Sequence, residues 1–251
     1  MNPGALPEPP ADLAGRTLSI LDFGKSIFRS HNVFRHPVFF GNAGLYRFDA
    51  PDGSYKVLYA GLDLHCAFIE SLIKNANSRV VTTTELKSKA VAELKAVRAL
   101  RLIDLTPSGA LMRMGADSRL FSGDHGAARI WSKALHDHPI RADGILYPSR
   151  LDPVRQAVAL FEDRAPKLVE LSLQVWYAPG PLRHSLAQIA EHYKIELIEN
   201  RFVTPRKPIA AAPGLLDLKP LICSEALSAR ILYSCRNVTA GSTSRDHRAG
   251  T

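Results

Sequence analysis

Five polar side chains lie in or beside short apolar runs of this sequence, where residues that served only packing would be Val or Leu. They are Arg29 in SIFRSHN, Arg47 in GLYRFDAPDG, Tyr59 in VLYAG, Glu70 in CAFIES and Ser149 in GILYPSR. Each has an ordinary structural explanation when it is taken alone, such as a surface ion pair for an arginine or a turn for the serine. Only the set as a whole makes them functional candidates.

The chemistry open to this set is anion binding combined with stabilisation of positive charge. An arginine fork holds phosphate oxygens through two parallel hydrogen bonds and keeps its charge at any relevant pH. A single carboxylate can stabilise a developing cation or orient an attacking group. Arg29 and Arg47 therefore suit a phosphate-bearing ligand, and Glu70 suits a reaction that builds up positive charge.

Short strands that alternate with modest helices must position these residues. Strands are predicted at 26–30, 44–48, 56–60, 79–83, 101–105, 144–149, 157–161 and 168–176. Helical spacing of apolar residues appears at 63–74, 125–137 and 186–194. Because regular helices and Gly-rich turns do not separate the strands, we predict an α+β fold with a mixed, mostly antiparallel sheet and short helices, not a doubly wound parallel one.

The composition is that of a globular protein long enough to bury its own core. The chain has 251 residues, of which 46% are hydrophobic and 22% charged. Its three cysteines, Cys66, Cys223 and Cys235, form no C-x-x-C pair, and no apolar run is long enough to cross a bilayer. We therefore expect a cytoplasmic protein without disulfides or a membrane span, in which Cys66 is a small apolar filler and not a nucleophile.

The two ends of the chain differ in composition from its middle. Residues 1–15 are rich in Pro, Ala and Gly and are predicted to be a disordered leader. Residues 200–251 hold +5 of the formal net charge of +8, and we predict a basic, partly disordered annex with one helical stretch at 221–232. Few aromatic residues interleave with these basic ones, which disfavours direct nucleic-acid binding. The main domain is predicted to span 16–199.

Several common functional motifs are absent from the sequence. G-x-G-x-x-G, G-x-x-x-x-G-K-[ST], H-E-x-x-H and G-x-S-x-G do not occur, which removes the usual dehydrogenase, P-loop, zinc-protease and α/β-hydrolase assignments. His136 and His138 end a predicted helix before Pro139, and histidine at a helix C-terminus is more typical of a dipole interaction than of metal binding. No metal site is predicted.

Taken in order, the five candidates resemble the RES family of bacterial toxins, which is named for its Arg, Glu and Ser. The similar stretch begins at IFRSH, runs through GLYRFDAPDGSYKVLYAGLDLHCAFIESL, and returns in RLIDLT and ADGILYPSRLDP, so it covers about residues 25–162. The sequence departs from the commoner family pattern after Arg47, where Phe48-Asp49-Ala50 replaces the usual Trp-Asn stretch.

The resemblance implies a fold similar to that of ADP-ribosyltransferases and a catalytic domain over 16–199 that consumes NAD. The implied reaction is cleavage of the nicotinamide–ribose bond, by phosphorolysis with inorganic phosphate as co-substrate or by hydrolysis, with no permanently bound cofactor. Loss of neutral nicotinamide leaves positive charge on the ribose, as in glycoside hydrolysis.

The resemblance also implies residue roles that suit this reaction. Arg47, Tyr59 and Glu70 are the implied catalytic residues, and the dinucleotide is bound by Arg29, Arg47, Tyr59 and Ser149. The arginines would hold its pyrophosphate or the attacking phosphate, and Tyr59 would pack on the nicotinamide or ribose and orient them through its hydroxyl. Glu70 would act electrostatically, and Ser149 would hydrogen-bond the ribose or the nicotinamide amide.

The implied partner is a small antitoxin with a DNA-binding domain. Two other functions stay open from the sequence. One is an ADP-ribosyltransferase that acts on a protein acceptor, which would use the same residues with a different attacking group. The other is a non-catalytic module that binds a nucleotide or nucleic acid, against which the presence of all five residues argues.

Overall fold

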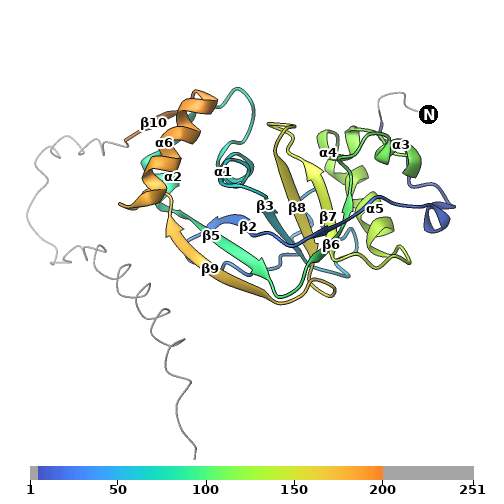
Figure 1. The fold of residues 1–251 in the computed structure, drawn as a ribbon. Helices are drawn as coiled ribbons and strands as arrows, with labels where there is room; N and C mark the ends of the chain where they lie inside the picture. The colour runs from blue at the N-terminus through green and yellow to red at the C-terminus, as the bar shows by residue number, and fades with distance from the viewer. Residues whose placement is uncertain (1–4, 200–251) are drawn as a thin grey trace, which may run out of the picture. The chain divides into compact units, whose positions relative to one another are not determined.

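An eight-stranded sheet is the main element of the computed structural model, which describes residues 5–199 (Figure 1). The strand order is β1-β6-β7-β8-β3-β2-β5-β9, and only β6 and β7 are parallel neighbours. The strands are β1 (Ile20–Phe23), β2 (Ile27–Asn32), β3 (Val57–Gly61), β5 (Lys89–Ala96), β6 (Leu100–Asp104), β7 (Gly144–Pro148), β8 (Gln156–Phe161) and β9 (Leu168–Val175). The predicted α+β class with a mixed, mostly antiparallel sheet is confirmed. A separate parallel pair joins β4 (Val80–Thr82) to β10 (Glu196–Ile198).

Short helices lie in two groups (Figure 1), one on the side of β2, β3, β5 and β9 and the other on the side of β6 and β7. The first group is α1 (Leu64–Leu72), α2 (Thr83–Lys87) and α6 (Pro181–Tyr193). The second group is α3 (Ala110–Met114), α4 (Arg119–Ser122) and α5 (His125–His136).

Side-chain caps explain where two of the predicted helices begin. Asp63 accepts a hydrogen bond from the main-chain N–H of Cys66 at 2.8 Å, and Asp124 accepts one from Ala127 at 3.0 Å. Each cap satisfies a donor that the first helical turn leaves free. The helices predicted at 63–74 and 125–137 are therefore confirmed as α1 and α5. The helix predicted at 186–194 begins earlier, at Pro181, whose fixed φ suits the first helical position.

Alternate residues of the central strands face different parts of the core. Val57 and Ala159 belong to the cluster that contains Trp131 of α5, whereas Leu58 and Leu160 belong to a cluster on the opposite face of the sheet. This follows from the two-residue period of a strand. A strand buried on both faces needs a nearly continuous apolar run, and for this reason the sequence predicts β3 and β8 well.

Gly61, at the end of β3, allows α1 to pack directly against the sheet. A Cβ at this position would lie 2.6 Å from the Ala67 nitrogen and 2.8 Å from the Cys66 Cβ. A larger residue would therefore push α1, which carries Glu70, away from β3. Gly61 also pairs with Phe28, and this is the one residue pair that joins β2 and β3 in the sheet.

The secondary-structure prediction misses β1, β10 and the short helices α2, α3 and α4. Two further differences have a clear physical cause. Residues 44–48 form turns and not a strand, because the Asp49 carboxylate accepts hydrogen bonds from the main-chain N–H of Leu45 and Tyr46. The sequence also does not predict β5, whose residues KAVAELKA include Ala, Lys, Glu and Leu, all of which favour helices. The neighbours of this strand in the sheet override that propensity.

The described part of the leader, residues 5–15, differs from the prediction of disorder. Leu6 and Leu13 are buried in the core, and the Trp131 Nε1–H donates a hydrogen bond to the Pro7 carbonyl at 2.6 Å. A proline-rich composition argues against helix and strand, but two leucines are enough to fix such a segment on an apolar surface.

The remaining domain prediction falls on the end of the chain. The annex predicted at 200–251, with its helical stretch at 221–232, lies outside the described residues. The main domain predicted at 16–199 stays a prediction.

Candidate active site

Glu70 and Ser149 meet although 79 positions separate them in the chain. Glu70 lies in the last turn of α1 and is exposed, whereas Ser149 directly follows β7 and is buried. The Ser149 Oγ donates a hydrogen bond to the Glu70 Oε1 at 2.5 Å. The Ser149 Oγ also accepts hydrogen bonds from the main-chain N–H of Leu151 at 3.2 Å and of Asp152 at 3.3 Å. Ser149 therefore ties the turn after β7 to the Glu70 carboxylate.

Arg47 is buried beside this pair. Its Nη1 donates hydrogen bonds to the carbonyls of Gly123 at 2.9 Å and Leu120 at 3.4 Å, at the end of α4, where main-chain carbonyls lack helical partners. Burial lowers the pKa of Arg47, and the neighbouring Arg150 lowers it further, while Tyr147, Glu70 and Tyr59 oppose the shift. The other donors of the guanidinium, Nε and Nη2, make no hydrogen bond to another described residue.

Tyr59 supports the turn that carries Arg47. Its hydroxyl accepts a hydrogen bond from the Phe48 N–H at 2.9 Å and donates one to the Asp49 Oδ1 at 2.9 Å. The Asp49 Oδ2 in turn accepts the N–H groups of Leu45 and Tyr46, each at 3.0 Å. Burial raises the pKa of Tyr59 well above its ordinary value, and the Asp49 carboxylate adds to the shift.

No hydrogen bond or ion pair between described residues joins Arg29 to the other four candidates. Its Nη1 donates to the carbonyls of Phe39 at 2.5 Å and Pro37 at 3.0 Å, so it anchors the loop that follows β2. Burial, with a smaller effect of Arg35, lowers the pKa of Arg29 to about 10, and Tyr46 opposes the shift. Arg29 interacts electrostatically with Tyr46, and the ring centroid of Tyr46 lies 5.5 Å from that of Tyr59.

Three residues near the site are absent from the sequence-based set. Tyr147 is 8% exposed, packs edge-on against Phe48 with ring centroids 4.8 Å apart, and interacts electrostatically with both Glu70 and Arg47. Asp49 organises the Arg47 turn, and Arg150 places a second positive charge near Arg47. One signal for Tyr147 is present in the sequence, because it lies two residues before Ser149 and so on the same side of β7.

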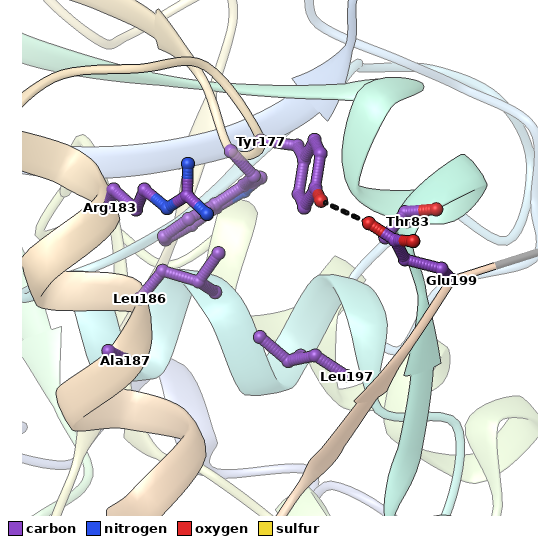
Figure 2. A pocket seen from close by; sticks show the side chains of 8 residues that line it. Thr83, Tyr177, Arg183, Leu186, Ala187, Leu197 and Glu199 are labelled. Carbon is purple, nitrogen blue, oxygen red and sulfur yellow. Dashed lines mark hydrogen bonds between the residues drawn. The ribbon is translucent and has the colours of Figure 1, made fainter.

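Two cavities among the described residues lie elsewhere. One, of about 250 Å³, is lined by residues of α2 and α6, by Leu197 of β10 and by residues next to these elements, with Tyr177 donating a hydrogen bond to Glu199 at 3.3 Å (Figure 2). The other, of about 210 Å³, lies between α6 and strands β2, β5 and β9. None of the five predicted site residues lines either cavity. A hydrogen bond joins Glu70 to Ser149, and electrostatic interactions join Arg47 to Glu70 and Tyr59.

Within residues 5–199 neither a cluster of metal-binding side chains nor a helix able to span a membrane is present. No three His, Cys, Asp or Glu side chains of this part of the chain are grouped as metal ligands. No helix among these residues is long and apolar enough to span a bilayer. Cys66 is buried, and burial raises the pKa of its thiol far above the ordinary value, as expected for a packing residue.

Comparison with known proteins places this site within a known domain family. The family model of the RES domain matches residues 26–183, a range that contains all five predicted site residues. A curated relative, "Probable toxin y4kH" of Sinorhizobium fredii (strain NBRC 101917 / NGR234), is 32% identical over 133 residues, which are 51% of this chain and 98% of the relative.

A solved structure shares the fold. It is a chain of the crystal structure of the M. tuberculosis MbcT-MbcA toxin-antitoxin complex, which aligns with a TM-score of 0.53. The sequence identity is 13%, and the alignment covers 71% of this chain and 98% of that one.

Proposed function

The chain belongs to the RES family, and from this premise we propose that it cleaves the nicotinamide–ribose bond of NAD. One observation carries the proposal. The Arg47 guanidinium and the Glu70 carboxylate attract each other, yet no ion pair within 4.0 Å joins these two described residues. A cation and an anion that face each other without pairing can receive the anionic and the cationic parts of one ligand.

Arg47 suits the anionic part. Its Nη1 is used by two carbonyls, but the Nε and Nη2 donors are free of other described residues and present the side of the fork that can bind two oxygens. We assign to it the pyrophosphate of NAD or, in phosphorolysis, the attacking inorganic phosphate. Arg150 adds positive charge beside it.

Glu70 suits the cationic part. When the bond between the ribose C1 and the pyridine nitrogen breaks, the electron pair leaves with nicotinamide, and positive charge develops on the ribose. A carboxylate fixed nearby lowers the energy of that state. An oxygen of water or phosphate then bonds to C1, and in hydrolysis the water gives up its proton to the carboxylate or to solvent.

The geometry favours a different role for Ser149 from the one that the resemblance implies. Its hydroxyl donates its single proton to Glu70 and accepts two main-chain N–H groups, so its hydrogen-bonding capacity is filled. We therefore assign it to the orientation of Glu70 and not to contact with NAD.

A toxic activity that an antitoxin restrains is part of the same proposal. It is supported by the name of the curated relative, a probable toxin, and by the toxin–antitoxin complex that shares the fold. The proposed partner is an antitoxin with a DNA-binding domain, and the proposed place of action is the cytoplasm. Expression of the chain alone should deplete cellular NAD and slow growth, and co-expression of its antitoxin should restore both.

Incubation of the purified full chain with NAD tests the chemistry. We expect nicotinamide release, with ADP-ribose 1-phosphate as the second product if phosphate is required and ADP-ribose if it is not. Release that occurs only with an added protein, which becomes labelled with ADP-ribose, would instead identify a transferase. No release under any of these conditions contradicts the proposal.

A further inference from the structure

The candidate site holds two tyrosines, the buried Tyr147 and the half-buried Tyr59, whose hydroxyls differ in what they bind. The Tyr59 hydroxyl donates its only proton to Asp49 and accepts the Phe48 N–H. A phenol has one donor, so Tyr59 cannot donate to a ligand without breaking its bond to Asp49. The hydroxyl of Tyr147 makes no hydrogen bond to another described residue.

The hydrogen bonds of Tyr59 belong to a network that fixes the main chain after Arg47. Tyr59 holds the Phe48 N–H, and the Ser132 Oγ donates to the Phe48 carbonyl at 2.7 Å. Ser132 is itself hydrogen-bonded to the Tyr55 hydroxyl at 2.7 Å. Asp49 is 1% exposed and closes the turn from the other side. Both polar groups of Phe48 are thereby held, which fixes the base of the Arg47 side chain.

The hydroxyl of Tyr147 is unpartnered without being completely buried. Among residues 5–199, only His31 and Arg164 have fully buried side-chain polar atoms without a hydrogen-bond partner. The unpartnered Tyr147 hydroxyl is therefore not fully enclosed, although the residue is only 8% exposed and its ring is packed against Phe48. Its strongest electrostatic neighbours include Glu70 and Arg47, the two charges of the site.

The protonation state of Tyr147 suits a hydrogen-bond donor. Burial raises its pKa well above the ordinary value, the Glu70 carboxylate and Cys66 add to the shift, and Arg47 opposes it. The phenol is thus neutral at physiological pH and keeps its proton. An unpaired donor beside a carboxylate and a guanidinium is suited to an oxygen atom of a neutral group, such as a ribose hydroxyl or a carboxamide carbonyl.

We propose that Tyr147, and not Tyr59, is the tyrosine that hydrogen-bonds the bound dinucleotide, and that Tyr59 and Asp49 are positioning residues for Arg47. This assignment rests on the proposed function, since it divides roles within the same site. It predicts different consequences for two substitutions that each remove one hydroxyl group.

The test compares Tyr147→Phe with Tyr59→Phe in the full chain, with Tyr177→Phe as the matched control outside the site. For Tyr147→Phe we expect kcat/KM for nicotinamide release to fall about 10- to 100-fold, with an unchanged midpoint of thermal unfolding. For Tyr59→Phe we expect the midpoint to fall by about 2–8 °C, because the buried Asp49 carboxylate and Phe48 N–H lose a partner. Tyr177→Phe should leave the rate unchanged.

A binding measurement separates contact from positioning. In the background of Glu70→Gln, which should prevent turnover, calorimetric titration with NAD gives affinities without reaction. Tyr147→Phe should weaken binding about 10-fold in this background, whereas Asp49→Asn should retain binding once the protein is kept below its lowered unfolding temperature.

The outcomes distinguish this inference from the proposed function. If the wild type releases nicotinamide and Tyr147→Phe does so at the same rate with the same affinity for NAD, the assignment of Tyr147 is wrong and the function stands. If Tyr59→Phe lowers kcat/KM for nicotinamide release without any loss of thermal stability, Tyr59 contacts substrate and the assignment is again wrong. If the wild type releases no nicotinamide, both the function and the inference are overturned.

Discussion

Arg29 and Arg47 offer a comparison between two regions that the sequence treats alike. Each guanidinium uses its Nη1 to hold two main-chain carbonyls, those of Pro37 and Phe39 for Arg29 and those of Leu120 and Gly123 for Arg47. Each is therefore an anchor for a loop. The two differ in their surroundings, because Arg47 faces a carboxylate and Arg29 faces a second arginine, Arg35.

The difference shows that residue type and sequence spacing identify a guanidinium fork but not its neighbours. Around Arg47 the charge is mixed, and three elements besides its own turn contribute side chains: Glu70 from α1, Tyr59 from β3 and Tyr147 from β7. Around Arg29 the charge is positive, and the contacts come from the loop directly after its own strand. A reaction that separates charge is better served by the Arg47 region.

The largest expected effect comes from removing the negative charge of the Arg47 region. Glu70→Gln keeps the hydrogen bond from Ser149 but removes the charge that would stabilise the ribose cation, so we expect kcat to fall about 10²- to 10³-fold. Steady-state nicotinamide release measures this. Glu170→Gln, an exposed substitution on β9, is the matched control and should leave kcat unchanged; equal rates for both variants would contradict the role of Glu70.

Replacing the fork by a point charge should have the next largest effect. Arg47→Lys keeps the positive charge near Glu70 but loses the planar donors on the free side of the guanidinium, so kcat/KM should fall about 100-fold. The thermal midpoint should fall as well, because the carbonyls of Leu120 and Gly123 lose a donor. A rate unchanged in a folded Arg47→Lys variant would remove Arg47 from the site.

Ser149→Ala is expected to have a smaller effect. The substitution frees the Glu70 carboxylate and releases two main-chain N–H groups of the turn after β7. We expect about a 10-fold fall in kcat with little change in KM, since the hydroxyl orients Glu70 and does not contact NAD. A rise in KM at constant kcat would instead support direct binding of NAD by Ser149.

Arg29→Lys tests whether Arg29 only anchors a loop and does not bind the substrate. Since Arg29 anchors the loop at Pro37 and Phe39 through one nitrogen, a lysine can keep part of this contact. We expect kcat/KM to fall by less than about 5-fold, well below the effect of Arg47→Lys. Equal losses for the two lysine variants would show that both arginines bind the substrate.

The smallest expected effect is the response to alkaline pH. Burial raises the pKa of both Tyr59 and Tyr147 well above the ordinary value of tyrosine. A raised pKa keeps an acidic group neutral to higher pH, so both phenols stay protonated between pH 8 and 10. The rate should therefore show no tyrosine-dependent fall in that window. A fall centred near pH 10 that disappears in Tyr147→Phe would contradict this.

The sequence predicts those features of the fold that local patterns determine. Apolar runs identify β3 and β8 because both faces of these strands are buried, and the helical spacing of apolar residues identifies α1 and α5. β5 is missed because its Ala, Lys and Glu residues resemble a helix and only its neighbours in the sheet make it a strand. The packing of the leader is missed because it depends on contacts with Trp131, more than a hundred positions away.

The sequence predicts the candidate site less completely than the fold. It identifies four residues that the structure brings together, Arg47, Tyr59, Glu70 and Ser149. It does not indicate that the hydroxyls of Tyr59 and Ser149 already make hydrogen bonds within the protein. These bonds involve groups from other segments of the chain, which the local sequence does not identify. Tyr147 also escapes detection, because an apolar strand has no local feature that separates a core tyrosine from one with an open hydroxyl.

A crystal structure of Glu70→Gln with NAD bound tests the proposed site most directly. We expect the nicotinamide ribose to lie between residue 70 and Arg47, with the Tyr147 hydroxyl within hydrogen-bond distance of the ligand and Ser149 still bonded to residue 70. NAD bound instead in the cavity beside Tyr177 and Arg183, or at Arg29 without contact to Arg47, would contradict it.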